Sequence, residues 1–342
     1  MLIIRKSWVV FVYAIAISME SIIIEYLTTS SVHFSPIMLS AISITSAGIM
    51  LLLVAAFIFK KKKEILILFI KSWKILILAT LSLSLGVFTW YDSINKIGAS
   101  KEVLIAGPLE IVFIVVLARV FLNERLNGFH FIGITMALIG FFMAVASGAN
   151  IGDVADNIGT INTKSAPSLS AIISFGDIEA ILSASGFAIG VLFLSKLVLK
   201  HSSIEVAGAS MFTSGLILVG FMILGLFCGS FHVGLSSNEE SLLRQPSIVT
   251  VISILFLFSL IPFIGSLSYS TGLSKIGASL TATIGSSSIL ITITIQIILK
   301  ELGFTSRLPE NMFLAILGGI VGFFGIYLIH MPGFLIPITK RI

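Results

Sequence analysis

The stretch KIGASKEVLIAGPLEIVFIVVLARVFLNER, residues 96–125, decides how the rest of the chain is interpreted. It holds an apolar run long enough to cross a bilayer as one helix, which takes about 20 residues. The run is interrupted by Gly107-Pro108 and then by Glu110, an acid in apolar surroundings. Its opening letters, KIGAS, return at residues 275–279, where another long apolar run begins. This repetition predicts a chain built from two related halves.

The composition is that of a membrane protein. Of the 342 residues, 57% are hydrophobic and 11% are charged, whereas soluble domains carry about 25% charged residues. The apolar runs are continuous and do not alternate as the strands of a membrane β-barrel do. We therefore expect an all-α membrane protein, and we assign the net charge of +5 to loops rather than to a nucleic-acid surface.

Hydropathy predicts ten transmembrane helices and divides the chain into two five-helix repeats. The first repeat covers residues 1–148, an external linker rich in Gly, Asn, Ser, Thr and Asp covers 149–177, and the second repeat covers 178–342. The predicted spans are 8–28, 37–59, 73–93, 97–121, 128–148, 178–199, 204–228, 247–271, 276–299 and 311–331.

The basic residues predict the orientation in the cell membrane. Cytoplasmic loops carry an excess of Lys and Arg, so the run of lysines at 60–63 marks the loop after the second span as cytoplasmic. Alternate counting then places both termini in the cytoplasm, with Arg5 and Lys6 at one end and Lys340 and Arg341 at the other. The linker, which holds Asp153 and Asp156, falls outside.

Five helices per repeat give the two repeats opposite orientations. KIGAS opens the fourth and the ninth span, and LIGFF at 138–142 in the fifth span is echoed by IVGFF at 320–324 in the tenth. Inverted repeats are a recurring plan of secondary transporters, in which the ligand binds between the halves near the middle of the bilayer.

One pattern occurs twice in the chain: KIGAS, a proline, NERL and then a Gly-rich helix. On this pattern the chain resembles the drug/metabolite transporter superfamily and in particular its EamA-type ten-helix members. The resemblance is densest over residues 97–145 and weaker over 276–329. It implies two inverted halves, a central cavity and transport of small metabolites or drugs, often outward. The chain departs from the family where Ser286-Ser287-Ser288 replaces the counterpart of Gly107-Pro108-Leu109, and where the first and fourth spans carry extra charge, which leaves the substrate open.

Two acids near the centres of their spans are candidates for binding a substrate or a proton. They are Glu20 in the first span and Glu110 in the fourth. An ionisable group at bilayer depth costs at least about 2.5–3.5 kcal/mol on insertion scales, so its presence calls for a role. One interpretation is that both face a central cavity and exchange a proton; the other is that each is a buried polar group bonded to a neighbouring helix.

Other unusual residues have two interpretations each. Gly107 and Pro108 predict a helix kink that frees the carbonyl of Leu104, or they relieve packing. At similar depth to Glu25 and Glu102, Lys101 is expected to pair with one of them or to extend to the surface. Glu124 is expected to hold a helix end.

The remaining candidates are aromatic and hydroxyl side chains. Trp90, Tyr91 and Tyr269 end their spans, so an interfacial aromatic belt is favoured over a gate or a stacking surface for substrate, the role considered for Trp90. In the polar ninth span, Thr283 and Ser287 are candidates for lining a cavity, while small-residue packing accounts for most of its hydroxyls.

The sequence favours transport over other functions. Its five histidines are scattered, no activated serine or paired His/Asp set is spaced for catalysis, and no phosphate-binding loop ends in Gly-Lys-Ser/Thr. We therefore predict no metal, no cofactor and no enzyme activity. The alternatives are an uncoupled facilitator within transport, and an intramembrane enzyme or a structural membrane protein outside it. The expected partners are a small-molecule substrate, the lipid bilayer and protons; the oligomeric state is open, a homodimer included.

The predicted topology can be tested with reporter fusions. A reporter after Ile342 should signal the cytoplasm, and one inserted near Asn157 should signal the outside, because of the Lys and Arg distribution. Two reporters on the same side of the membrane would overturn the inverted-repeat assignment.

Overall fold

The computed structural model describes residues 4–29, 34–122, 128–148, 173–227, 248–304 and 306–335. Within these ranges it is entirely helical, and ten helices are long and apolar enough to cross a membrane. The prediction of an all-α protein with ten spans is confirmed. The spans are 8–29, 36–58, 73–97, 99–121, 128–146, 175–198, 203–225, 253–276, 280–301 and 312–329.

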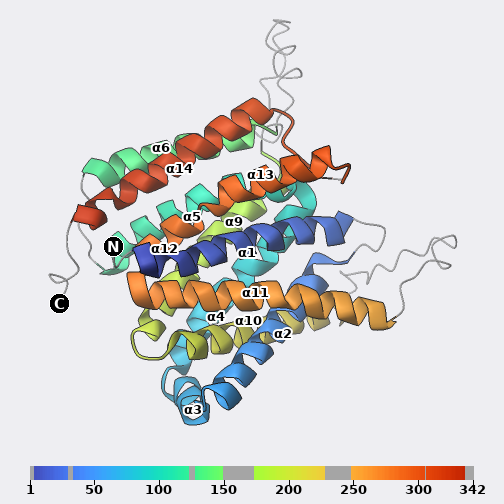
Figure 1. Ribbon diagram of the computed structural model, residues 1–342, viewed down its shortest axis with the longest axis vertical. Coiled ribbons are helices and arrows are strands. Elements are labelled where there is room, and N and C mark those ends of the chain that lie inside the picture. Colours follow the sequence, from blue (N-terminus) through green and yellow to red (C-terminus); the bar gives the residue numbers. More distant parts are fainter. Residues whose placement is uncertain are drawn as a thin grey trace, which may run out of the picture.

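The helices follow one another along the chain with few breaks (Figure 1). Their bounds are α1 Ile4–Thr29, α2 Pro36–Leu53 with a π-helical end η1 Val54–Ile58, α3 Lys62–Lys71, α4 Trp73–Ile97, α5 Ala99–Leu122, α6 Gly128–Ala146, α9 Phe175–Val198, α10 Ser203–Phe227, α11 Ile248–Ile276, α12 Ala278–Gly285, α13 Ser288–Glu301 and α14 Met312–Leu335.

Two details differ from the expected spans. Helix α9 begins at Phe175, inside the segment assigned to the linker, because Ser174 and Asp177 form a reciprocal capping box. Residues 149–172 of that linker, and Glu124, lie outside the described residues. The ninth span is broken at Ser286-Ser287 into α12 and α13, whereas α5 runs through Pro108 as one helix.

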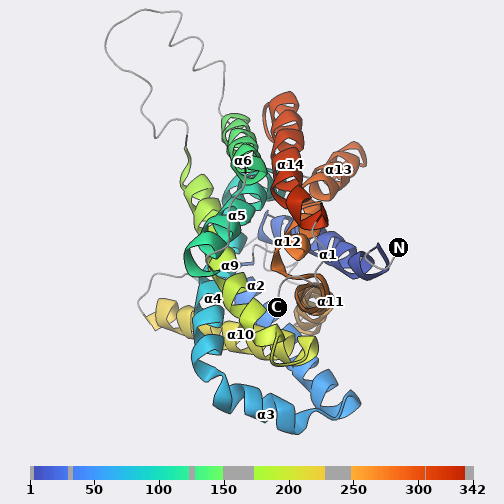
Figure 2. The ribbon, with the colours of Figure 1, turned by 90° about the vertical axis from the view of Figure 1, so that its left-hand side faces the viewer.

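Helix α3 was not expected from the sequence. Its 10 residues are too few to cross the membrane. Leu66, Ile67 and Ile70 are exposed, and both ribbon views place the helix at the edge of the bundle (Figures 1 and 2). A short helix that carries exposed apolar side chains beside a lysine run fits the membrane–water interface.

The bundle has two closely packed edges and a central group of helices. Helix α6 lies along α14 at one edge, and α2 lies along α10 at the other (Figures 1 and 2). Between these edges, α4 packs along α9 and α1 along α11, while α5 contacts α9 and α13 contacts α1. The central helices therefore come from both halves of the chain.

These contacts repeat when each helix of the first half is exchanged for its counterpart in the second. The exchange converts the α4–α9 contact into α11–α1, and both are present. A Cβ on Gly48 would lie 2.3 Å from the backbone nitrogen of Phe212, and one on Gly215 would lie 2.7 Å from that of Thr45. Each glycine thus meets the residue one turn before the other glycine. Packing of this reciprocal kind is what two related inverted halves require.

The echoed motifs LIGFF and IVGFF meet each other at the α6–α14 edge. A Cβ on Gly140 would lie 2.6 Å from the backbone nitrogen of Gly322. A Cβ on Gly133 would lie equally close, 2.6 Å, to the carbonyl oxygen of Gly325. The two helices approach backbone to backbone because glycine leaves this space open.

Replacing one of these glycines should loosen the edge. We expect Gly140→Ala to destabilise the folded protein by about 1–3 kcal/mol, since the added methyl group overlaps backbone atoms that cannot move aside alone. Gly220→Ala in α10 is the matched control, because no described atom lies within 4 Å of the added carbon. Thermal unfolding in detergent measures both, and equal melting temperatures would contradict the proposed contact.

Candidate substrate cavity

A cavity lies among the central helices α1, α4, α5, α9, α11 and α12. It has two adjoining chambers, one of about 70 Å³ and one of about 120 Å³. Since one water needs about 10–15 Å³ of such a cavity, the space holds several waters or a compact organic molecule. Both chambers share six lining residues, namely Tyr13, Ile17, Trp90, Glu110, Phe187 and Tyr269.

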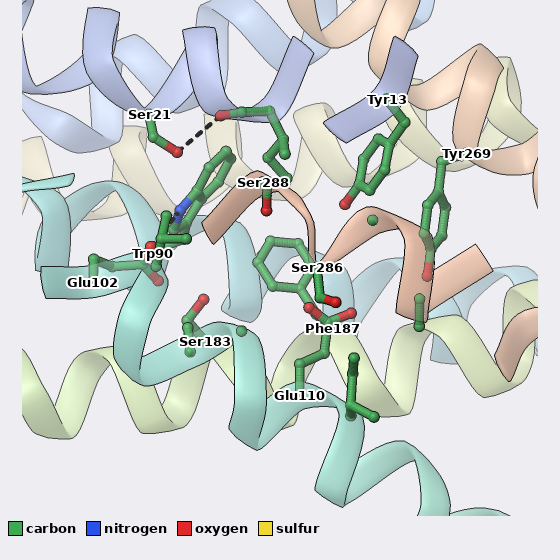
Figure 3. A pocket seen from close by; sticks show the side chains of 17 residues that line it. Tyr13, Ser21, Trp90, Glu102, Glu110, Ser183, Phe187, Tyr269, Ser286 and Ser288 are labelled. Carbon is green, nitrogen blue, oxygen red and sulfur yellow. Dashed lines mark hydrogen bonds between the residues drawn. The ribbon is translucent and has the colours of Figure 1, made fainter. Parts of the chain in front are cut away.

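Glu110 reaches from α5 into this cavity (Figure 3). It is partly accessible, and it forms no hydrogen bond or ion pair with any residue that the structure describes. Gly107, one turn earlier, also lines the smaller chamber, and a Cβ there would lie 2.8 Å from Ile289. Pro108 faces Gly322 on α14. The Gly-Pro pair thus lets α13 and α14 pack closely beside the acid.

Glu20 lines the larger chamber but is held in place. Its carboxylate accepts a hydrogen bond of 2.7 Å from the hydroxyl of Tyr91. That hydroxyl also lies 3.1 Å from the Oγ of Ser43. Glu20 is therefore fixed at the cavity wall by a hydrogen bond, whereas Glu110 has no such bond with a described residue and is partly accessible.

A third acid, Glu102, lines the smaller chamber. Its Oε2 accepts a hydrogen bond of 3.1 Å from the indole nitrogen of Trp90. The Trp90 ring in turn packs edge-on against Phe187, with centroids 5.9 Å apart. In the sequence Glu102 is only an expected partner of Lys101; the structure shows that it orients an aromatic wall of the cavity instead.

The favoured interfacial belt for Trp90, Tyr91 and Tyr269 is wrong. All three side chains are buried. Tyr269 lies against Tyr13 across the cavity wall, with ring centroids 4.7 Å apart. Span ends read from hydropathy cannot distinguish a lipid-facing ring from one turned inward by helix packing.

The hydroxyl candidates of the ninth span are also placed differently. Ser286 and Ser288 line the smaller chamber, while neither chamber includes Thr283 or Ser287 among its described lining residues. Ser287 instead donates to the carbonyl of Ile284, at 2.7 Å. The prediction assumed one continuous helix; the break between α12 and α13 changes which side chains face inward.

Lys101 pairs with neither Glu25 nor Glu102. Its ammonium lies 2.8 Å from Asp177 of α9, and both side chains are largely buried. The pairing arises because α5 packs against α9, a contact between the two halves that depth along the membrane does not reveal. Removing one partner of such a buried pair would leave an uncompensated charge.

Three cavity residues that the sequence did not single out as site residues carry buried polar atoms that have no hydrogen-bond partner among the described residues. They are Glu102 through Oε1, Ser183 through Oγ and Tyr269 through its hydroxyl. Such atoms are available to a bound molecule, since an unmet buried polar group costs about 1–3 kcal/mol. The sequence did contain a signal for Tyr269. When the two halves are aligned so that Gly98 matches Gly277, Trp90 matches Tyr269.

The charged residues among the described lining of the cavity are all acidic. Glu20, Glu102 and Glu110 line it, and no Lys, Arg or His is among its described lining residues. In the same alignment the counterparts of Glu102 and Glu110 are Thr281 and Ile289, so these acids belong to the first half alone. No group of three or more His, Cys, Asp and Glu residues that could hold a metal occurs in the described part of the chain.

Comparisons with known proteins agree with this architecture. Residues 6–146 match the model of the EamA-like transporter family. A solved protein crystal structure is similar in fold, with a TM-score of 0.53 and 16% identity, over 92% of this chain and 96% of the other. No curated protein matches the sequence.

Proposed function

We propose that the chain, whose residues 6–146 match the model of the EamA-like transporter family, exports small organic cations across the cell membrane in exchange for protons. The match supports membrane transport of small molecules rather than catalysis. The observation that carries the finer proposal is the cavity between the two halves, where Glu110 is partly accessible and pairs with no described residue.

Glu110 is the proposed proton carrier. Exchange requires that a carboxyl group reach water in the cavity while apolar surroundings favour its neutral form. Glu110 is partly accessible and lines both chambers, and the apolar residues Val103, Ala106 and Ile111 line the smaller chamber with it. Glu20 accepts a hydrogen bond from the Tyr91 hydroxyl and serves as the second acid of the site.

The lining supports a positively charged substrate with an apolar or aromatic body. Carboxylates supply the opposite charge, and the faces of Tyr13, Trp90 and Tyr269 attract cations through their ring quadrupoles. A free carboxylate or phosphate on the substrate would meet like charge with no basic side chain among the described lining residues. The alternative of an uncoupled facilitator uses the same cavity but needs no titrating acid.

The coupling role of Glu110 is tested with Glu110→Gln in proteoliposomes. Glutamine keeps the size of the side chain but cannot titrate. We expect uphill transport driven by a pH gradient to be lost, while substrate exchange at equal pH survives because it moves no net proton. Glu110→Asp should retain partial coupling. If the glutamine variant drives uphill transport as wild type does, Glu110 is structural and the coupling part of the proposal fails.

The substrate charge is tested with three probes that share one aromatic ring. These are benzyltrimethylammonium, neutral N-benzylacetamide and benzylsulfonate. Only the cation should raise the melting temperature of the purified protein, since binding to the folded state stabilises it. We expect Glu110→Gln to weaken its binding about tenfold, which is about 1.4 kcal/mol. Asp92→Asn is the matched control, because Asp92 is a partly exposed acid paired with Lys96 and outside the cavity. Equal binding of the neutral probe would contradict a cation site.

A further inference from the structure

Glu25 is a buried acid that is not among the described lining residues of the cavity. It lies on α1 one turn beyond Ser21, which lines the smaller chamber. Its side chain is 3% exposed. No Lys or Arg side chain forms an ion pair with it among the described residues; instead its two oxygens accept three hydrogen bonds, from Ala99, Gln296 and Arg307.

The three donors come from different parts of the chain. The first donor is the backbone nitrogen of Ala99, the first residue of α5, which lies 2.7 Å from Glu25 Oε2. The second is the side-chain amide of Gln296 on α13, 2.6 Å from the same oxygen. The third donor is the backbone nitrogen of Arg307, in the segment after α13, also at 2.6 Å. A carboxylate at the first turn of α5 is also favoured by the helix dipole. Glu25 therefore joins α1 and α5 of the first half to the second half.

The surrounding contacts close the same end of the bundle. Gly98, the turn between α4 and α5, has φ +83°, and a Cβ there would lie 2.9 Å from both the Cβ and the carbonyl oxygen of Arg307. The guanidinium of Arg307 donates to the carbonyl of Asn95 at 2.7 Å. Gln296 also accepts from the hydroxyl of Ser100. We call this set, Glu25, Ala99, Ser100, Gln296 and Arg307, the Glu25 clamp.

Among the described residues, the related position in the second half has no such clamp. Gly277, the counterpart of Gly98, has the same backbone conformation with φ +85°, yet no described atom lies within 4 Å of a Cβ built there. Gly86 meets Gly186, and its counterpart Gly265 meets Ala16, so Ala16 corresponds to Gly186 and Glu25 to Ser195. The Ser195 hydroxyl donates within its own helix, to Leu192 at 2.8 Å. Gly98 and Gly277 are thus related in backbone conformation but differ in the described contacts around them.

We propose that the Glu25 clamp is the gate of the transport path at the α4–α5 end, and that this conformation is the one closed there. The smaller chamber is lined by Ser21 of α1, Glu102 of α5 and Ser288 of α13, and the clamp joins these three helices. Opening the path breaks the three hydrogen bonds to Glu25. Since bonds to a carboxylate are stronger than bonds to a neutral acceptor, the acid favours the closed conformation.

The gate is tested by the accessibility of a single cysteine. The only native cysteine, Cys228, is replaced by alanine, and Val103→Cys is introduced in the smaller chamber. A membrane-impermeant maleimide is then applied to each side of oriented vesicles in turn. We expect Glu25→Gln to raise the labelling rate about tenfold from the α4–α5 side and not from the other, because its amide presents a donor to groups that are themselves donors. Glu25→Asp should give a smaller rise.

Ser195→Ala, at the corresponding position, is the control and should leave both rates unchanged. A folded Glu25→Gln protein labelled at the wild-type rate, or faster from both sides equally, would overturn the gate. Should that variant fail to fold, the same comparison with Glu25→Asp decides the outcome. The assay contains neither substrate nor proton gradient, so its result is independent of the proposed coupling and substrate charge.

Discussion

The close approach of helix backbones at glycine is the contact on which the rest of the fold depends. Gly140 and Gly322 bring α6 and α14 together at one edge, and Gly48 and Gly215 do the same for α2 and α10 at the other. In a bilayer the apolar faces of helices gain little from leaving lipid, so van der Waals contact between small residues has to hold them. The two edges are closely packed, and the cavity lies among the central helices between them.

The cost of burying charge decides how the centre is built. Three buried ionisable groups are stabilised in different ways: Lys101 pairs with Asp177, Glu20 accepts a hydrogen bond from the Tyr91 hydroxyl, and Glu25 accepts three hydrogen bonds. Glu110 has none of these and is the one of the three cavity acids that stays partly accessible. A group that the protein leaves unsatisfied inside a membrane is available for a ligand or a proton.

A symmetric backbone carries an asymmetric set of side chains. Gly98 and Gly277 share one conformation, and Trp90 and Tyr269 occupy corresponding positions on the cavity wall. Yet Glu102 and Glu110 correspond to Thr281 and Ile289, and no described residue near Gly277 forms a counterpart to the clamp around Glu25. Inverted repeats allow the two ends of a transport path to exchange roles. The unequal side chains are the basis of the closure that we propose at the α4–α5 end.

The sequence by itself determined the ten spans, the kinship of the two halves and the presence of acids at bilayer depth, because these follow from hydropathy, repetition and position along a helix. Only the tertiary structure decided which way side chains face and what they bond. Trp90 turns inward, Lys101 meets Asp177, and Ser286 rather than Ser287 lines the cavity. The reason is physical: an apolar helix has no polar face to reveal its rotation, so contacts with neighbouring helices set it.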